Sequence, residues 1–172
     1  MLAQMKPLPN VGEAKSTPEP ADETVRVSRA NAEARMAPSR EGYINAIQVW
    51  PFTDGALYQV YAAPGRFTVV ALQPGEELVT VAAGDTVRWM VGDTSSGAEP
   101  RVNVLVKPTR SGLKTNLVVT MNRRTYLLEL TSTEKAWMAS VPWYYPKNRM
   151  LALQGQSQAV LATAPVDISM YV

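Results

Sequence analysis

The sequence lacks two of the residue types on which much enzyme chemistry depends. Its 172 residues include no Cys and no His. A single chain therefore cannot form a disulfide framework, a Cys/His zinc site, a Cys nucleophile or a Ser-His-Asp triad. Only carboxylate, hydroxyl, lysine and arginine side chains remain for catalysis. The absence of Cys is compatible with both cytosol and periplasm.

Long hydrophobic runs and a strong net charge are also absent. No stretch approaches the roughly 20 apolar residues that span a bilayer, so we expect no membrane span. The 17 basic and 15 acidic residues give a net charge of +2, which is too small to indicate a nucleic-acid-binding protein. Any charged binding surface must therefore be local.

Aromatic residues are missing from the first quarter of the chain. All 13 of them lie at Tyr43 or later, while residues 1–42 hold five of the 13 prolines. Such a segment buries too little apolar surface to offset the cost of ordering its backbone. We predict an extended or partner-ordered tail over 1–42. Its composition is also compatible with a short helix around 22–36 that Pro38 would end.

Residues 43–146 alternate between apolar and polar side chains, and turn residues separate the alternating runs. This pattern is typical of short, half-buried strands. About nine strands in a hundred residues leave no room for crossover helices, so the predicted fold class is all-β, an antiparallel β-sandwich. The expected strands are 43–50, 57–62, 66–73, 77–81, 85–91, 101–107, 116–121, 125–131 and 136–144.

The turn residues support these boundaries. Pro64-Gly65 and Pro74-Gly75 suit the two central positions of type II turns. Asn122-Arg123 is placed to close a hairpin between two predicted strands. The Gly-, Ser- and Asp-rich segment 92–100 predicts a long exposed loop.

After Pro146 the composition changes to Leu, Gln and Ala, which predicts a linker helix over 148–164 that Pro165 would stop. Residues 166–172 alternate again, like the start of another strand. We therefore divide the chain into a tail at 1–42, a sandwich domain at 43–146 and a linker at 147–172, which leads toward a second domain that is absent here.

Several short motifs occur in the order found in one known family. They are Leu72-Gln73-Pro74-Gly75-Glu76, Gly84-Asp85 followed by Trp89, Val106-Lys107-Pro108, Thr115-Asn116-Leu117, Thr120-Met121-Asn122-Arg123-Arg124-Thr125-Tyr126 and Tyr144-Tyr145-Pro146. On these residues the chain resembles the amino-terminal domain of the TrbG/CagX family, conjugal-transfer proteins of the outer-membrane core complex of type IV secretion systems.

The resemblance implies a structural subunit that forms a homo-oligomeric ring layer of the secretion channel, in the periplasm and associated with the outer-membrane core complex. It implies two partners, a TrbI-like core subunit anchored in the inner membrane and a small outer-membrane lipoprotein, the latter contacting the absent second domain. Transported DNA or protein would pass the ring transiently. The alternative from a different class is a periplasmic β-sandwich module that binds a peptide or glycan through exposed aromatic residues such as Tyr58, Tyr61 or Tyr144.

Arg123 and Arg124 are the first candidate interface residues. With Lys107, Arg110 and Lys114 in neighbouring loops, they are expected to form a basic cluster at one end of the sandwich, facing an acidic partner or a DNA lumen. Two other interpretations stay open. The charges are ordinary solvated loop residues, or Arg124 is structural and pairs with a carboxylate such as Glu129 or Asp85.

Trp143, Tyr144 and Tyr145 are the other candidate interface residues. Neighbours on a strand point to opposite faces, so at least one of these rings lies outside the core. Such rings suit either the centre of an interface or a cap on the sandwich. Trp50, Trp89 and Trp137 alternate with apolar neighbours and are expected in the core.

No catalytic, metal or cofactor residues are expected. Ser111-Gly112-Leu113-Lys114 matches the Ser-x-x-Lys pattern of acyl-transfer enzymes. That chemistry requires helical spacing to bring the amine beside the hydroxyl, and this segment precedes a strand. We therefore expect a protein that is not an enzyme.

Overall fold

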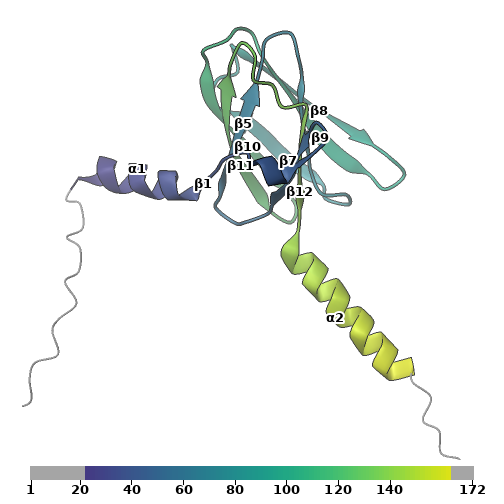
Figure 1. Cartoon of the computed structure of the whole chain (residues 1–172). Helices are drawn as coiled ribbons and strands as arrows, with labels where there is room; N and C mark the ends of the chain where they lie inside the picture. Colours follow the sequence, from purple (N-terminus) through teal and green to yellow (C-terminus); the bar gives the residue numbers. More distant parts are fainter. Residues whose placement is uncertain (1–21, 164–172) are drawn as a thin grey trace, which may run out of the picture. The chain divides into compact units, whose positions relative to one another are not determined.

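The computed structural model describes residues 22–163 and divides into two compact units, with the boundary between Glu33 and Ala34 (Figure 1). The strand expected over 166–172 and the first half of the expected tail lie outside the described residues. Each unit is described by itself below.

The first unit contributes helix α1 (Glu23–Ala34), which has no buried residue. The carboxylate of Asp22 accepts a hydrogen bond of 2.9 Å from the backbone N–H of Thr24, as an N-cap does. Arg26 pairs with Glu23 at 3.5 Å, and Arg29 with Glu33 at 3.9 Å. The short helix compatible with this composition is present. The expected tail is therefore not extended over these residues, because capping and local ion pairs favour the helix.

One sheet of the second unit has the strand order β1-β5-β11-β10-β7. Its central strands β10 and β11 form an antiparallel hairpin, and β11 pairs in parallel with β5. The strands are β1 (Arg35–Met36), β5 (Leu57–Ala62), β7 (Leu78–Ala83), β10 (Lys114–Met121) and β11 (Thr125–Ser132). Because β1 pairs with β5, this sheet includes residues that precede Tyr43.

The other sheet has the order β2-β3-β12-β6-β9-β8, and β4 pairs with β12 beside this path. The pairs β6–β9 and β8–β9 are antiparallel, whereas β12 is parallel to β3, β4 and β6. The strands are β2 (Tyr43–Ile44), β3 (Ile47–Gln48), β4 (Trp50–Pro51), β6 (Thr68–Ala71), β8 (Trp89–Ser96), β9 (Arg101–Pro108) and β12 (Ser140–Tyr144).

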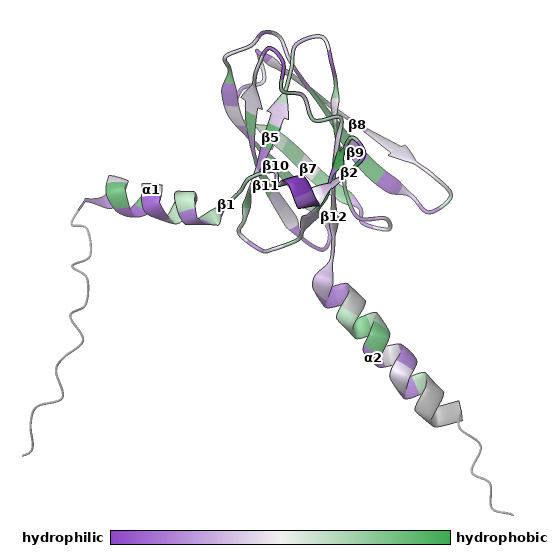
Figure 2. Ribbon diagram, viewed as in Figure 1, coloured by the Kyte–Doolittle hydropathy of each residue, from purple (hydrophilic) through white to green (hydrophobic). Residues whose placement is uncertain are grey.

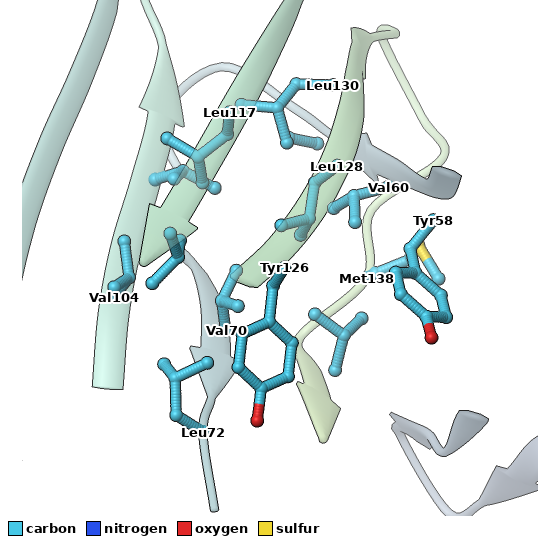
Figure 3. Packing of buried hydrophobic residues seen from close by; sticks show 14 of the residues in the cluster. Tyr58, Val60, Val70, Leu72, Val104, Leu117, Tyr126, Leu128, Leu130 and Met138 are labelled. Carbon is cyan, nitrogen blue, oxygen red and sulfur yellow. The ribbon is translucent and has the colours of Figure 1, made fainter. Parts of the chain in front are cut away.

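The all-β sandwich is confirmed, with two sheets that are mixed and not purely antiparallel. Apolar side chains of both sheets pack between them, among them Val60, Val104, Leu117 and Leu128 (Figure 3). Figure 2 shows the apolar residues gathered on the strands of this domain. This alternation of buried and less buried positions is clearest in β9, β10 and β11.

Two of the three tryptophans expected in the core are there. Trp50 and Trp89 are 3% and 2% exposed. Trp137 is 39% exposed, and the core prediction is wrong for it. It lies in the irregular segment that precedes β12, where strand alternation does not apply, and Met138 takes the buried position instead.

Two local predictions differ from the structure, and a third is confirmed. Residues 43–51 form three short strands in place of one. The loop expected at 92–100 is strand as far as Ser96, because β8 pairs with β9 through its backbone without burying this end. The predicted Pro-Gly turns are confirmed, with φ of 78° at Gly65 and 82° at Gly75.

Helix α2 (Pro146–Thr163) follows the sandwich and begins two residues before the predicted linker helix. Pro is favoured at the first position of a helix, which explains this start. Among residues 22–163 no helix is both long and apolar enough to cross a membrane.

Candidate functional site

The β10–β11 hairpin positions Arg124 beside the turn at Gln73–Glu76. The backbone N–H of Met121 donates to the carbonyl of Arg124 at 2.9 Å, which closes the predicted hairpin. Asn122 joins this hairpin to Glu77 through two hydrogen bonds. The Asn122 N–H donates to the Glu77 carbonyl at 2.9 Å, and the Asn122 side-chain oxygen accepts from the Glu77 N–H at 3.0 Å. Two turns distant in sequence therefore lie side by side.

This arrangement produces a buried ion pair. Nε of Arg124 lies 2.8 Å from Oε1 of Glu76, and the Glu76 side chain is completely buried while that of Arg124 is 14% exposed. The N–H of Arg124 is not aligned with Oε1, so the contact is ionic and not a well-formed hydrogen bond. Burial of the carboxylate is tolerable because a cation stands beside it.

Two tyrosines extend this pair into a network. The hydroxyl of Tyr126 donates to Oε2 of Glu76 at 2.8 Å and lies 2.8 Å from the hydroxyl of Tyr145. Because the Tyr126 proton is directed at Glu76, Tyr145 is the donor in the second bond. Burial raises the pKa of Tyr126 above its ordinary value and raises the pKa of Tyr145 to about 12. Both hydroxyls therefore stay protonated at neutral pH.

Aromatic rings hold the guanidinium of Arg124 from the sides. Its central carbon lies 4.3 Å from the ring centroid of Tyr145 and 4.9 Å from that of Phe52. These two rings are stacked, with centroids 6.0 Å apart. Cation–π contacts of this kind fix the plane of the guanidinium in addition to the ion pair.

A surface pocket of about 460 Å³ opens over this network. We call it the arginine–tyrosine pocket, and its principal lining residues are Phe52, Asp54, Arg123, Arg124, Tyr145 and Lys147. It combines cationic side chains with aromatic rings at the point where β12 passes into α2. Such a surface is equipped to recognise a ligand, since cations and rings supply charge and shape without a reactive group.

The structure brings three of the five candidate interface residues to this pocket: Arg123, Arg124 and Tyr145. Trp143 lies in the core, 4% exposed, with its ring 4.8 Å from that of Tyr126. Tyr144 is 50% exposed, so the expectation that at least one ring of this run lies outside the core is confirmed. The interface role of all five residues stays a prediction.

The larger basic cluster is not formed. Lys107, Arg110 and Lys114 precede or begin β10, whereas Arg123 and Arg124 follow its end. Eight strand residues separate the ends by about 23 Å at 3.3 Å per residue. The prediction failed because it joined loops at opposite ends of the same strand. Lys107 instead lies 4.7 Å from the ring centroid of Phe67.

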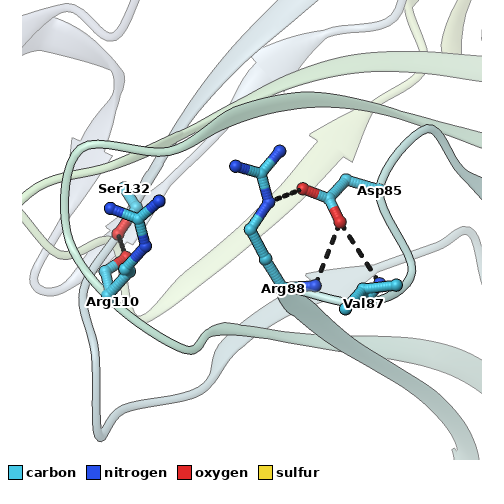
Figure 4. Close-up of polar contacts among 5 residues, drawn as sticks. All are labelled: Asp85, Val87, Arg88, Arg110 and Ser132. Atoms are coloured by element: carbon cyan, nitrogen blue, oxygen red, sulfur yellow. Dashed lines mark hydrogen bonds and ion pairs between the residues drawn. The ribbon is translucent and has the colours of Figure 1, made fainter.

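Arg124 is paired with a carboxylate, as one interpretation held, but both suggested partners are wrong. Glu129 pairs with Arg35 at 2.8 Å. Asp85 accepts hydrogen bonds from the backbone N–H groups of Val87 and Arg88 and pairs with the Arg88 side chain (Figure 4). The Arg88 N–H is the main reason that the pKa of Asp85 is lowered.

The remaining motifs do not converge on chemistry. In Ser111–Lys114, Gly112 has a φ of 77° and Lys114 begins β10, so the helical spacing of the Ser-x-x-Lys pattern is absent. Tyr58, one of the aromatics of the alternative peptide or glycan module, is buried and 1% exposed. Within residues 22–163 no group of three or more Asp or Glu side chains is placed to hold a metal ion.

Sequence reasoning missed Glu76, Phe52 and Lys147 as members of the site. Glu76 follows a Pro-Gly turn, and a turn position gives no indication that the side chain is buried. Phe52 follows Pro51 at the end of β4, and Lys147 follows Pro146 at the start of α2; neither proline indicates where the next side chain points. Only the pairing of β10, β11 and β12 with their neighbours places these residues together.

The fold and the pocket define a β-sandwich domain with a surface pocket lined by cationic side chains and aromatic rings. Comparison with known proteins identifies its family: residues 45–169 match the family model CagX, described as conjugal transfer protein, and the chain belongs to this family. A probable conjugal transfer protein TrbG from Sinorhizobium fredii is 40% identical over 91 residues, which are 52% of this chain and 34% of the relative. The match therefore spans about a third of the relative's length.

Proposed function

We propose that this chain is a structural, non-enzymatic subunit of a conjugation or type IV secretion channel. Copies of it form a homo-oligomeric ring layer in the periplasm, associated with the outer-membrane core complex. The observation that carries the proposal is membership of the conjugal transfer family over residues 45–169. In this role rigid sandwiches pack side by side around the path of the transported DNA or protein.

One feature of the domain supports an assembly role. Large apolar or aromatic side chains lie exposed on it, including Ile44, Phe67 and Tyr144 at 63%, 45% and 50%. Exposed rings of this kind are enriched at the centres of protein interfaces. The proposed partners are a TrbI-like core subunit anchored in the inner membrane and a small outer-membrane lipoprotein that contacts a second domain.

The test is the state of the full-length protein in donor cells that carry its transfer system. A photo-crosslinking residue replaces Tyr144, which is exposed, and in a matched control it replaces Leu128, which is 1% exposed. We expect a ladder of homo-oligomers from position 144 and none from position 128. The mass of the extracted core complex should show several copies. A strictly monomeric chain in the assembled complex contradicts the ring.

A further inference from the structure

The fold uses one edge of the Arg124 guanidinium, and the side chain, which is 14% exposed, borders the arginine–tyrosine pocket. Nε faces Glu76, and the rings of Tyr145 and Phe52 fix the plane. Within residues 22–163 no acceptor is hydrogen-bonded to the two Nη groups, and Arg124 lines the arginine–tyrosine pocket. The guanidinium is therefore preorganised, with a pair of donors available in a fixed fork.

The charges around the pocket favour a ligand of low negative charge. Arg123, Arg124 and Lys147 supply three cations, while Asp54 and the buried Glu76 supply two carboxylates, which leaves a net charge of about +1. One carboxylate neutralises such a site. A polyphosphate backbone is a poor match, because Asp54 in the wall repels it and one surplus charge replaces few counterions.

The start of helix α2 adds to the attraction. Pro146, Lys147 and Asn148 line the pocket and form the first turn of α2. Pro146 has no N–H, but the N–H groups of Lys147 and Asn148 have no intrahelical acceptor, and the positive end of the helix dipole lies there. The aromatic wall formed by Phe52 and Tyr145 gives the apolar stem of an acidic side chain a surface on which to pack.

We propose that the arginine–tyrosine pocket binds the carboxylate of an acidic, extended peptide segment of a partner chain, with Arg124 as the bidentate contact and Arg123 and Lys147 as flanking cations. This rests on the proposed function, in which the domain meets other subunits. Planar guanidinium–carboxylate pairs of this kind are strong and directional. The pocket then selects an acidic side chain by geometry as well as by charge.

The test uses the ¹⁵N-labelled full chain and three probes at matched ionic strength. These are Ac-Glu-Pro-Glu-NH₂, its neutral counterpart Ac-Gln-Pro-Gln-NH₂ and inorganic phosphate. NMR follows the Nε–Hε resonance of Arg124 and the backbone amides of Tyr145 and Asn148. We expect a saturable shift with the acidic peptide and little change with the neutral peptide or phosphate.

Variants of the exposed flanking cations keep the test independent of folding. Arg123→Gln/Lys147→Gln removes two exposed charges of the pocket, and Arg110→Gln/Lys135→Gln removes two exposed charges elsewhere. Arg123→Gln/Lys147→Gln should lower the affinity for the acidic peptide about five- to tenfold, as expected for two solvent-exposed charges. Arg110→Gln/Lys135→Gln should leave this affinity unchanged. Unaltered amide dispersion shows that both variants are folded.

Three outcomes overturn the inference: no shift at Arg124, equal shifts with the acidic and neutral peptides, or an equal effect of phosphate, which marks a general anion site. The titration does not require the chain to form a homo-oligomeric ring. A chain that binds the peptide but is monomeric in the assembled complex refutes the proposed function alone. A chain that forms the homo-oligomeric ring but does not bind the peptide refutes this inference alone.

Discussion

The Glu76–Arg124 pair shows how a single buried charge shapes this domain. Removing two charges from water costs much of what their attraction returns, so a buried pair adds little net stability, but the loss of one partner leaves the other uncompensated. Glu76 is completely buried, with Arg124 on one oxygen and Tyr126 on the other. The network therefore acts mainly to fix the position of the guanidinium at the pocket wall.

We expect Arg124→Gln to lower the free energy of unfolding by about 3 kcal/mol, because it leaves the Glu76 carboxylate buried without a cation. Glu76→Gln/Arg124→Gln should recover a large part of that loss, since no charge is then buried. Urea unfolding of the wild type, both single variants and the double variant measures the coupling. Additive effects of the two substitutions would show that the pair is not coupled.

The sequence allowed a structural role for Arg124 to be predicted, but not its partner. Suitable carboxylates were available at Asp85 and Glu129 as well as at Glu76, and composition does not rank them. The choice is made by Asn122, which ties the hairpin to Glu77 through two hydrogen bonds. Asp85 already forms an ion pair with Arg88, which lies only three residues away in the sequence. A long-range contact of this kind follows from the tertiary arrangement.

At the scale of elements, turns were more predictable than strand ends. The Pro-Gly turn at 74–75 is closed by the Glu76 N–H, which donates to the Gln73 carbonyl at 3.2 Å, and it requires a positive φ at Gly75. Strands with one buried face, such as β9 and β11, were recognised from their alternation. The outer end of β8 was missed, because its residues are exposed on both faces and only backbone pairing makes it a strand.

Gly75→Ala should cost about 1–2 kcal/mol of unfolding free energy, because a side chain is strained at a φ of 82° even though no atom lies within 4 Å of the added methyl group. Gly92→Ala is the matched control: its added methyl also meets nothing within 4 Å, but its φ is not in the positive range. Urea unfolding compares the two variants. Equal effects would mean that backbone strain at position 75 does not contribute to stability.

For the whole molecule, the all-β sandwich followed from alternation and turn spacing, whereas its strand order did not. The parallel pairing of β5 with β11 joins Tyr58 to Leu128, and no local pattern indicates that contact. For the same reason, the sequence pattern did not indicate that the sheet begins at β1, before Tyr43. Met36 packs against the core and Arg35 pairs with Glu129, although neither stands in a run of apolar residues.

Two truncations test where the folded domain begins. A chain that starts at Ala34 should unfold with the stability of the full chain, because α1 buries no residue. A chain that starts at Pro38 should lose about 1–2 kcal/mol through the partial burial of Met36 alone, and it also loses the Arg35–Glu129 pair at 2.8 Å. Equal stability of both chains at pH 7 would place the start of the domain after Ala37.

The Arg35–Glu129 pair also makes this difference depend on pH. The hydrogen bond from Arg35 lowers the pKa of Glu129, so the pair stabilises the fold above the unfolded pKa of about 4.3 and ceases to do so as the pH falls through the lower folded value. The difference in stability between the two truncated chains should therefore narrow on acidification, and urea unfolding at pH 7 and near pH 3 measures this change.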